Sequence, residues 1–278
     1  MPSAAETENL LADFAIYGSH KQDENALCRV WRPRTSCDPV SAKNLPMSDL
    51  VQNAKTVLIK DLTPTQVTVG MREVDIKRQL WREKHSHGSV NYLNKHRLPV
   101  VLGPNARHYL IDRHHLTLAL YDEGVSELPV LIVANLSGYG FDEFWKTLED
   151  HHWTHPFDDQ GRRRSYYAMP TSVDALIDDP FRSLAGALKR AGGYTKDKAP
   201  FSEFRWADFM RSRIPRELIE PHFGRALVLA MSLTESPEAA ALPGWRRHPE
   251  LTIGRRFVYP DKQQRPTKGN LVSLLSAS

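Results

Sequence analysis

Cysteine and long apolar segments are both scarce in this chain of 278 residues. Its two cysteines, Cys28 and Cys37, fit neither a zinc motif nor a disulfide framework, so we expect free thiols in a reducing compartment. No stretch reaches the roughly 18 apolar residues of a membrane-spanning helix, and the first residues lack the basic and apolar regions of a signal peptide. We therefore expect a cytoplasmic protein with no membrane partner.

Several motifs of nucleotide-binding and hydrolytic proteins are also missing. The sequence contains no P-loop, no nucleophile elbow, no Rossmann glycine fingerprint and no internal repeat. Its formal net charge of +4 permits an anionic ligand but is far below the charge density of a protein that coats DNA. A nucleotide is therefore as plausible a ligand as a nucleic acid, and the oligomeric state is left open.

Local patterns predict an α+β fold. Two β-prone runs around a Gly-Pro-Asn turn predict a hairpin over residues 98–111, and a β-branched run predicts a buried strand over 128–134. Apolar positions at helical spacing predict helices that begin near Gly70 and Asp112. These elements form a compact α+β module of strands and two helices.

Four regions follow from these patterns and from the change to helical spacing after Gly140. We expect an N-terminal arm at 1–44, an α+β core at 45–140, a mainly helical region at 141–236 packed on the core, and a basic tail at 237–278.

The corner at Asp112 is the main candidate site. Asp112 is a strong N-cap residue type, and the helix that follows would carry Arg113, His114 and His115 in its first turn. Unpaired backbone N–H groups and the helix dipole attract an anion there and keep a histidine neutral near pH 7. Such a histidine could act as a base or a metal ligand, or the pair could simply be buried and hydrogen-bonded.

Two further helices offer candidate residues. Glu73 and Lys77 form an i,i+4 pair, which a solvated surface ion pair would also explain. Arg182 and Ser183 follow Asp178-Asp179-Pro180, a helix start, and form a second candidate anion site. Gly186, inside that helix, predicts close packing against a neighbouring element.

Two polar clusters have weaker signals. His151 and His155 would share one face if their helix continued, and could then bind zinc or haem iron, but Pro156 favours a helix end. The run Arg162-Arg163-Arg164 before two tyrosines suits a solvated face, or phosphate contact with base stacking.

Three stretches resemble one known family. They are GPxxxxYxIDxHHxxxAL over 103–120, LTPTQxxxGMxEVxxK over 62–77 and DDPFRSLAG over 178–186. Together they resemble the ParB-like nuclease family of the ParB/sulfiredoxin superfamily, over about residues 50–214. The equivalent corner carries a Gly-Glu-Arg-Arg type motif in ParB and a Gly-Cys-His-Arg type motif in sulfiredoxin, both of which contact nucleotide phosphates. This chain has Asp-Arg-His-His instead, so the resemblance implies the fold, a small mixed sheet with flanking helices, and a phosphate-facing site, rather than CTP-clamp behaviour or sulfinic-acid repair.

The leading hypothesis is an enzyme that acts on a phosphate-containing ligand. It would cleave a nucleotide or nucleic-acid phosphoester, as a nuclease or nucleotide hydrolase, or transfer a phosphoryl group to a small molecule, as a kinase. The resemblance implies that Lys77 touches phosphate and that Glu73 acts as acid, base or metal ligand. Arg113, Arg182 and Ser183 would bind phosphate.

The remaining roles complete that hypothesis. His114 or His115 would move a proton, and Glu73 or Asp112 could hold Mg²⁺ that accompanies a nucleotide; no resident metal is assigned. Two alternatives remain: a non-catalytic nucleotide- or DNA-binding module, and a haem- or zinc-binding enzyme that uses the histidines.

Overall fold

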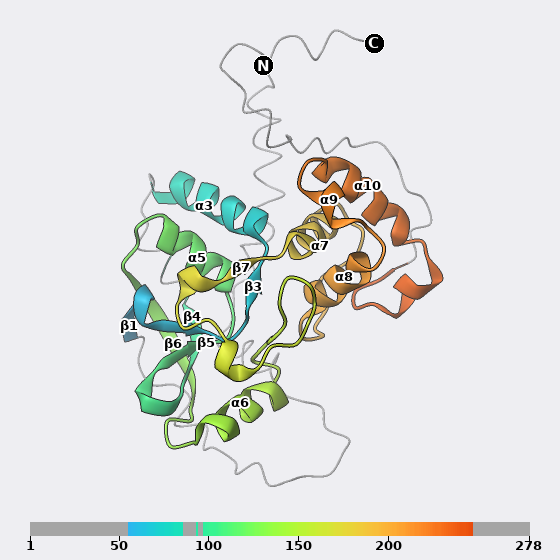
Figure 1. Ribbon diagram of the computed structural model, residues 1–278. Coiled ribbons are helices and arrows are strands. Elements are labelled where there is room, and N and C mark those ends of the chain that lie inside the picture. Colours follow the sequence, from blue (N-terminus) through green and yellow to red (C-terminus); the bar gives the residue numbers. More distant parts are fainter. Residues whose placement is uncertain (1–54, 86–92, 94–96, 247–278) are drawn as a thin grey trace. The chain divides into compact units, whose positions relative to one another are not determined.

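The computed structural model describes residues 55–85, 93 and 97–246 (Figure 1). The expected N-terminal arm, both cysteines and most of the expected basic tail lie outside these residues. In the described part, no helix is long and apolar enough to cross a membrane. The proposed region boundaries at 44, 140 and 236 stay predictions.

The described part of the chain begins with a five-stranded mixed sheet. Its spatial order is β1-β6-β4-β5-β2, with antiparallel pairs β1/β6 and β4/β5 and parallel pairs β4/β6 and β2/β5. The strands are β1 (Lys55–Leu58), β2 (Leu62–Pro64), β4 (Leu98–Leu102), β5 (His108–Leu110) and β6 (Glu127–Asn135). A separate parallel pair joins β3 (Thr68–Val69) to β7 (Ile177–Asp178). The predicted hairpin is confirmed, and so is the strand predicted over 128–134, although only Leu128, Val130 and Ala134 of β6 are buried.

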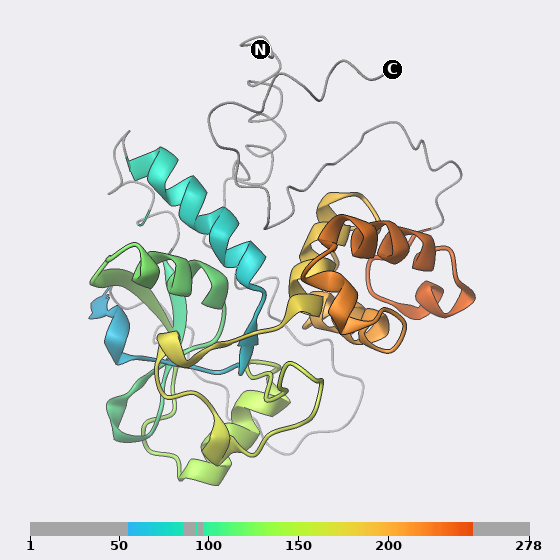
Figure 2. The ribbon, with the colours of Figure 1, turned by 45° about the horizontal axis from the view of Figure 1, so that its top comes forward.

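Helices cover the sheet and continue the chain beyond it. They are α3 (Met71–His85), α5 (His114–Asp122), α6 (Phe141–Asp150), α7 (Pro180–Arg190), α8 (Ser202–Arg211), α9 (Arg216–Ile219) and α10 (Phe223–Leu233). Helices α3 and α5 pack against each other, and α7 packs against α8 and α10 (Figures 1 and 2). The predicted α+β class, with flanking helices and a mainly helical region after the sheet, is confirmed.

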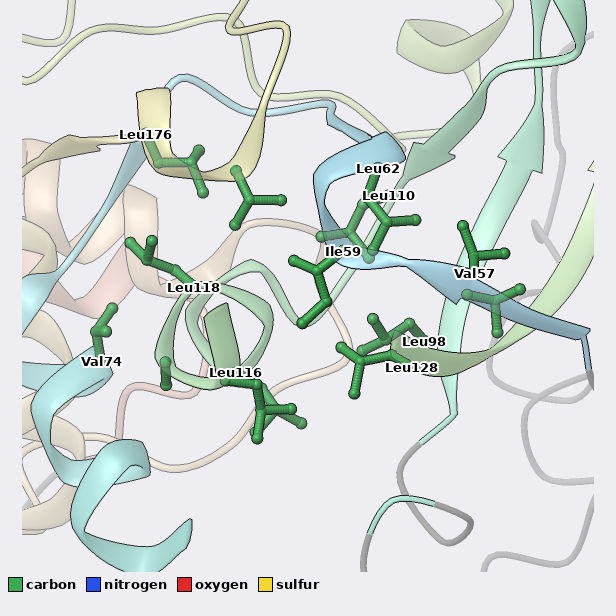
Figure 3. Close-up of a cluster of buried hydrophobic side chains, with 14 of the residues drawn as sticks. Val57, Ile59, Leu62, Val74, Leu98, Leu110, Leu116, Leu118, Leu128 and Leu176 are labelled. Atoms are coloured by element: carbon green, nitrogen blue, oxygen red, sulfur yellow. The ribbon is translucent and has the colours of Figure 1, made fainter. Parts of the chain in front are cut away.

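One apolar cluster joins the sheet to α5 and α3 (Figure 3). Leu62 and Leu110 come from neighbouring strands, Leu116 and Leu118 from α5, and Val74 from α3. All five are at most 5% exposed. Burial of one such side chain contributes about 1.5–3 kcal/mol, so this cluster holds α3 and α5 against the sheet.

A second apolar cluster holds α7 to α10 together. Its centre is Trp206 of α8, which is fully buried and stacks on Tyr194 with ring centroids 4.5 Å apart. The Tyr194 hydroxyl donates to the Ala185 carbonyl of α7, at 2.9 Å. Helix α7 contacts both α3 and the other helices of this cluster, so it lies at the junction between the sheet region and the later helices.

Candidate functional site

The corner after β5 differs in one respect from the sequence prediction. Helix α5 begins at His114, and its N-cap is Arg113, which has a left-handed backbone with φ 66°. The Asp112 carboxylate accepts a hydrogen bond from the Arg113 N–H at 2.6 Å, one residue before the helix. The prediction that Asp112 caps this helix is therefore wrong: its side chain stabilises the turn before the helix, where it is exposed.

His114 and His115 are buried, with exposed fractions of 3% and 9%. The Thr65 N–H donates to Nε2 of His114 at 3.2 Å, and the Gly70 N–H donates to Nε2 of His115 at 3.0 Å. Since an accepting Nε2 carries no proton, the proton of each neutral ring is on Nδ1. The two imidazoles thus hold the segment from Thr65 to Gly70, which leads directly into α3.

Both histidines are neutral near pH 7. Burial lowers the pKa of His114 to about 3. Burial, with the nearby charges of Arg182 and Lys77, lowers the pKa of His115 well below its usual value. The sequence predicts neutral histidines from the helix dipole, whereas desolvation is the main cause in the structure. Their assigned part in proton transfer stays a prediction.

Lys77 of α3 lies among other cations. Burial lowers the pKa of its ammonium, the charge of Glu73 raises it, and the charges of Arg113, Arg182 and Arg190 lower it. We call Lys77, Arg113, Arg182 and Arg190 the cation cluster. No hydrogen bond or ion pair of Lys77 is found within the described residues. A half-buried ammonium without such a partner, among three guanidinium groups, favours an anion as the missing partner.

Glu73 faces α7 rather than solvent. Nη1 of Arg190 lies 2.6 Å from its carboxylate, and a Cβ placed on Gly186 would lie only 2.5 Å from Oε1. The predicted close packing at Gly186 is therefore confirmed, with Glu73 as the neighbour. The alternative of a solvated Glu73–Lys77 ion pair is wrong, because the carboxylate pairs with Arg190 across 117 residues of sequence.

The two candidates on α7 have different surroundings. The Nε and Nη1 atoms of Arg182 are buried and have no hydrogen-bond partner in the described structure. Its guanidinium carbon lies 5.3 Å from the centre of the Phe204 ring. Ser183 is 2% exposed, and its Oγ accepts from the Arg72 N–H at 3.2 Å in the first turn of α3. Arg182 therefore has unused donors, while Ser183 joins two helix starts.

The structure thus brings five of the predicted residues together. Lys77, Glu73, Arg113, Arg182 and His115 interact electrostatically at the N-terminal parts of α3, α5 and α7. Arg190 is a member that the sequence prediction missed. Its only sequence signal is its position four residues after Gly186 on the same helix.

The two clusters with weaker signals have partners of their own. Helix α6 ends at Asp150, so His151 and His155 do not share a helical face. The arginines at 162–164 pair with Asp158 and Glu149. Within the described residues, no group of three or more histidine, cysteine, aspartate or glutamate side chains is arranged to hold a metal ion.

Comparisons with known proteins agree with this fold. A solved structure, protein Atu1540 from Agrobacterium tumefaciens, is 49% identical in sequence with a TM-score of 0.64, over 69% of this chain and 97% of that one. A search of curated proteins finds no match. The family model described as "Putative ParB-like nuclease" matches residues 55–212, more than half of the chain. The chain therefore belongs to the ParB-like nuclease family, as its sequence motifs indicate.

Proposed function

We propose that the cation cluster binds phosphate groups of a nucleotide or nucleic acid and that the protein cleaves or transfers a phosphoester bond there. The observation that carries the proposal is the half-buried Lys77 ammonium, which has no ion-pair partner in the described residues and lies near three arginines. Such an arrangement is destabilising without an anion and stabilising with one. Membership of the ParB-like nuclease family supports the same ligand class.

Each residue has a separate role in this proposal. Lys77 and Arg182 bind phosphate oxygens, because their donors have no other hydrogen-bond partner in the described structure. Arg113 offsets charge that develops on the phosphoryl group. Ser183 supports the phosphate subsite through its place between α3 and α7. Glu73, which pairs with Arg190, is the carboxylate whose charge acts on Lys77, and we assign it the role of proton acceptor.

The histidines have a more restricted role. His115 is the candidate nearer the cation cluster, because Lys77 and Arg182 help to lower its pKa. An anion bound there would offset those charges and raise that pKa, so we assign proton transfer to His115 rather than to His114. His114 has no such neighbours among the causes of its pKa shift. Asp112 is exposed at the corner and is the second candidate carboxylate.

Mg²⁺ enters the proposal as the counter-ion of a bound nucleotide. Glu73 offers one carboxylate, and its pairing with Arg190 leaves it a poor sole ligand for a resident ion. Zinc and haem fit less well, because no described cluster of three suitable side chains surrounds the histidines. Mg²⁺ would then neutralise phosphate charge and orient the leaving group.

The test is binding and turnover with and without Lys77. Titration of the full chain with ATP, CTP, tripolyphosphate and short DNA, each with and without Mg²⁺, measures affinity; phosphate release and DNA cleavage measure turnover. We expect Lys77→Met to weaken phosphate binding about 10- to 100-fold, since a hydrogen bond to a charged group contributes about 1.5–3 kcal/mol.

The matched control is Lys146→Met on α6. Lys146 is exposed and pairs with Asp150 at 3.2 Å, far along the chain from the cation cluster. Its replacement should leave ligand affinity unchanged. The proposal is wrong if no phosphate ligand binds, or if both lysine variants bind as the unmodified chain does. Binding without turnover would favour the non-catalytic module.

A further inference from the structure

A pocket of about 220 Å³ lies beside the start of α8. Its walls are mainly aromatic, and its rim is polar. The lining residues are His152, His155, Phe157, Pro200, Phe201, Phe204, Arg205 and Asp208. Drug-sized ligands occupy about 300–1,000 Å³, so this pocket has room for one flat ring system rather than for a large molecule.

His155 forms the centre of the aromatic wall. Its ring stacks on Phe204, with centroids 3.8 Å apart and planes 22° apart, and lies 5.0 Å from the Phe201 ring. Burial lowers the pKa of His155 to about 3, so the ring is neutral. Its Nδ1 atom is buried and has no hydrogen-bond partner in the described structure. The neutral imidazole thus adds a ring to the aromatic wall without adding charge, which favours an aromatic ligand.

Two residues of the pocket have an unfavourable backbone conformation. His152 has φ 57° and Phe201 has φ 56°, a left-handed conformation that is rare for bulky side chains. Such strain costs about 1–3 kcal/mol and is concentrated at functional sites. At both positions the conformation orients a ring-bearing residue that lines the same pocket.

The pocket adjoins the cation cluster through two connections. Arg182 lies 5.3 Å from the centre of the Phe204 ring and helps to lower the pKa of His155. The backbone of His155 also pairs with the segment that His114 holds: its N–H donates to the Thr65 carbonyl at 2.9 Å. Arg182 is thus a member of the cation cluster that also lies against the aromatic wall of the pocket.

We infer that this pocket binds the base of a nucleotide whose phosphates occupy the cation cluster. This inference rests on the proposed function, and it narrows the ligand from any phosphate to a nucleoside phosphate. The base stacks in the ring-lined pocket against Phe201 and His155, and Arg182 contacts the first phosphate.

Three kinds of ligand distinguish binding at the proposed base site from binding at the proposed phosphate site. Calorimetric titration of the full chain with tripolyphosphate, with adenosine and with ATP, GTP, CTP and UTP compares phosphate alone, base alone and both. We expect at least one nucleotide to bind about 5- to 100-fold more tightly than tripolyphosphate, the range that base stacking on an aromatic ring provides.

Phe201→Gly is the principal variant. It removes one aromatic wall, and glycine adopts the left-handed backbone at residue 201 without strain, so the variant should fold. We expect it to abolish the advantage of the nucleotide while tripolyphosphate binding stays within twofold. His155→Leu should have the same effect. The control Tyr167→Ala removes a 78% exposed ring elsewhere and should change nothing.

The outcomes distinguish the two proposals. Equal binding of all four nucleotides and tripolyphosphate overturns the base pocket and leaves the proposed function intact. Binding of adenosine that Phe201→Gly abolishes, without any binding of tripolyphosphate, supports the pocket and overturns the phosphate site. If neither adenosine nor any phosphate ligand binds, both proposals are wrong.

Discussion

At the scale of single residues, two helical glycines predict opposite responses to the same substitution. A Cβ on Gly186 of α7 would lie 2.5 Å from the Glu73 carboxylate, whereas a Cβ on Gly224 of α10 would have no atom within 4 Å. A Cβ at Gly186 must push the end of the Glu73 side chain away from Arg190. This loss exceeds the roughly 1 kcal/mol that alanine gains in a helix, so we expect Gly186→Ala to destabilise the fold by about 1 kcal/mol net. Gly224→Ala should stabilise it by about 0.5–1 kcal/mol, because alanine favours the helix.

Urea unfolding of both variants measures this difference. Gly186→Ala should also displace Glu73 from Arg190, so it should alter any activity that needs that carboxylate. Equal stability of the two variants would show that α3 and α7 are not packed as closely as the structure has them.

Some features of single residues could be predicted from the sequence and others could not. The tight packing at Gly186 was predicted because glycine in a helix interior needs a reason. The cap at Arg113 was not, because an arginine with φ 66° contradicts the residue preferences on which the prediction depends. The burial of Lys77 was not predicted either: the Glu73–Lys77 spacing is the same for a solvated pair as for a buried site.

At the scale of helices, one buried ion pair joins α7 to α8. Asp179 is 1% exposed, caps α7 by accepting from the Phe181 N–H at 3.0 Å, and pairs with Arg211 of α8 at 2.8 Å. Removal of one partner leaves a buried charge unpaired, so we expect Asp179→Ala to cost about 3–5 kcal/mol in the free energy of unfolding.

Two further variants divide that cost into its parts. Asp179→Asn keeps a side-chain oxygen that can cap α7 but removes the charge. It should therefore keep the cap's contribution to stability and cost about 1 kcal/mol less than Asp179→Ala. Asp208→Ala removes the more exposed partner of Arg211 and should cost at most about 1 kcal/mol. Chemical denaturation of all three variants checks the order, and a cost for Asp179→Ala no greater than for Asp208→Ala would contradict it.

Most helices and strands were predictable because their signals are local. The hairpin over β4 and β5, the strand β6, and the helices α3, α5, α6 and α7 each depend on apolar spacing and turn residues within a short stretch. The role of the arginines at 162–164 was left undecided, because spacing does not reveal that Arg163 pairs with Glu149 of α6 while its two neighbours pair with Asp158.

At the scale of the whole described structure, the candidate site is assembled from distant segments. Glu73 and Arg190 are 117 residues apart, and His155 stacks on a phenylalanine 49 positions later in the chain. Periodicity cannot report such pairs, because it describes one helix or strand at a time. Family resemblance singled out Lys77 and Glu73 for the proposed phosphate site, but it gave no sign of Arg190 or of the aromatic pocket.

Buried neutral histidines make stability depend on pH. In the folded chain burial lowers the pKa of His114 to about 3, while an unfolded histidine has a pKa near 6.5. As pH falls through 6.5, the unfolded chain takes up a proton at this position and the folded chain does not, so stability is lost. For one such histidine the loss between pH 7.5 and 5.5 is about 1.4 kcal/mol.

The variant His114→Gln measures how much of the pH dependence of stability comes from His114. The glutamine amide oxygen can still accept a hydrogen bond, but it does not titrate, so the stability change from pH 7.5 to 5.5 should be smaller by about 1.4 kcal/mol than in the unmodified chain. The control His151→Gln makes the same substitution at an exposed histidine away from the buried pair. Urea unfolding at the two pH values gives both numbers, and every other titrating group cancels in the comparison. An unaltered pH dependence in His114→Gln would show that His114 takes up a proton in the folded chain with a pKa near its ordinary value. His114 would then again be a candidate for proton transfer.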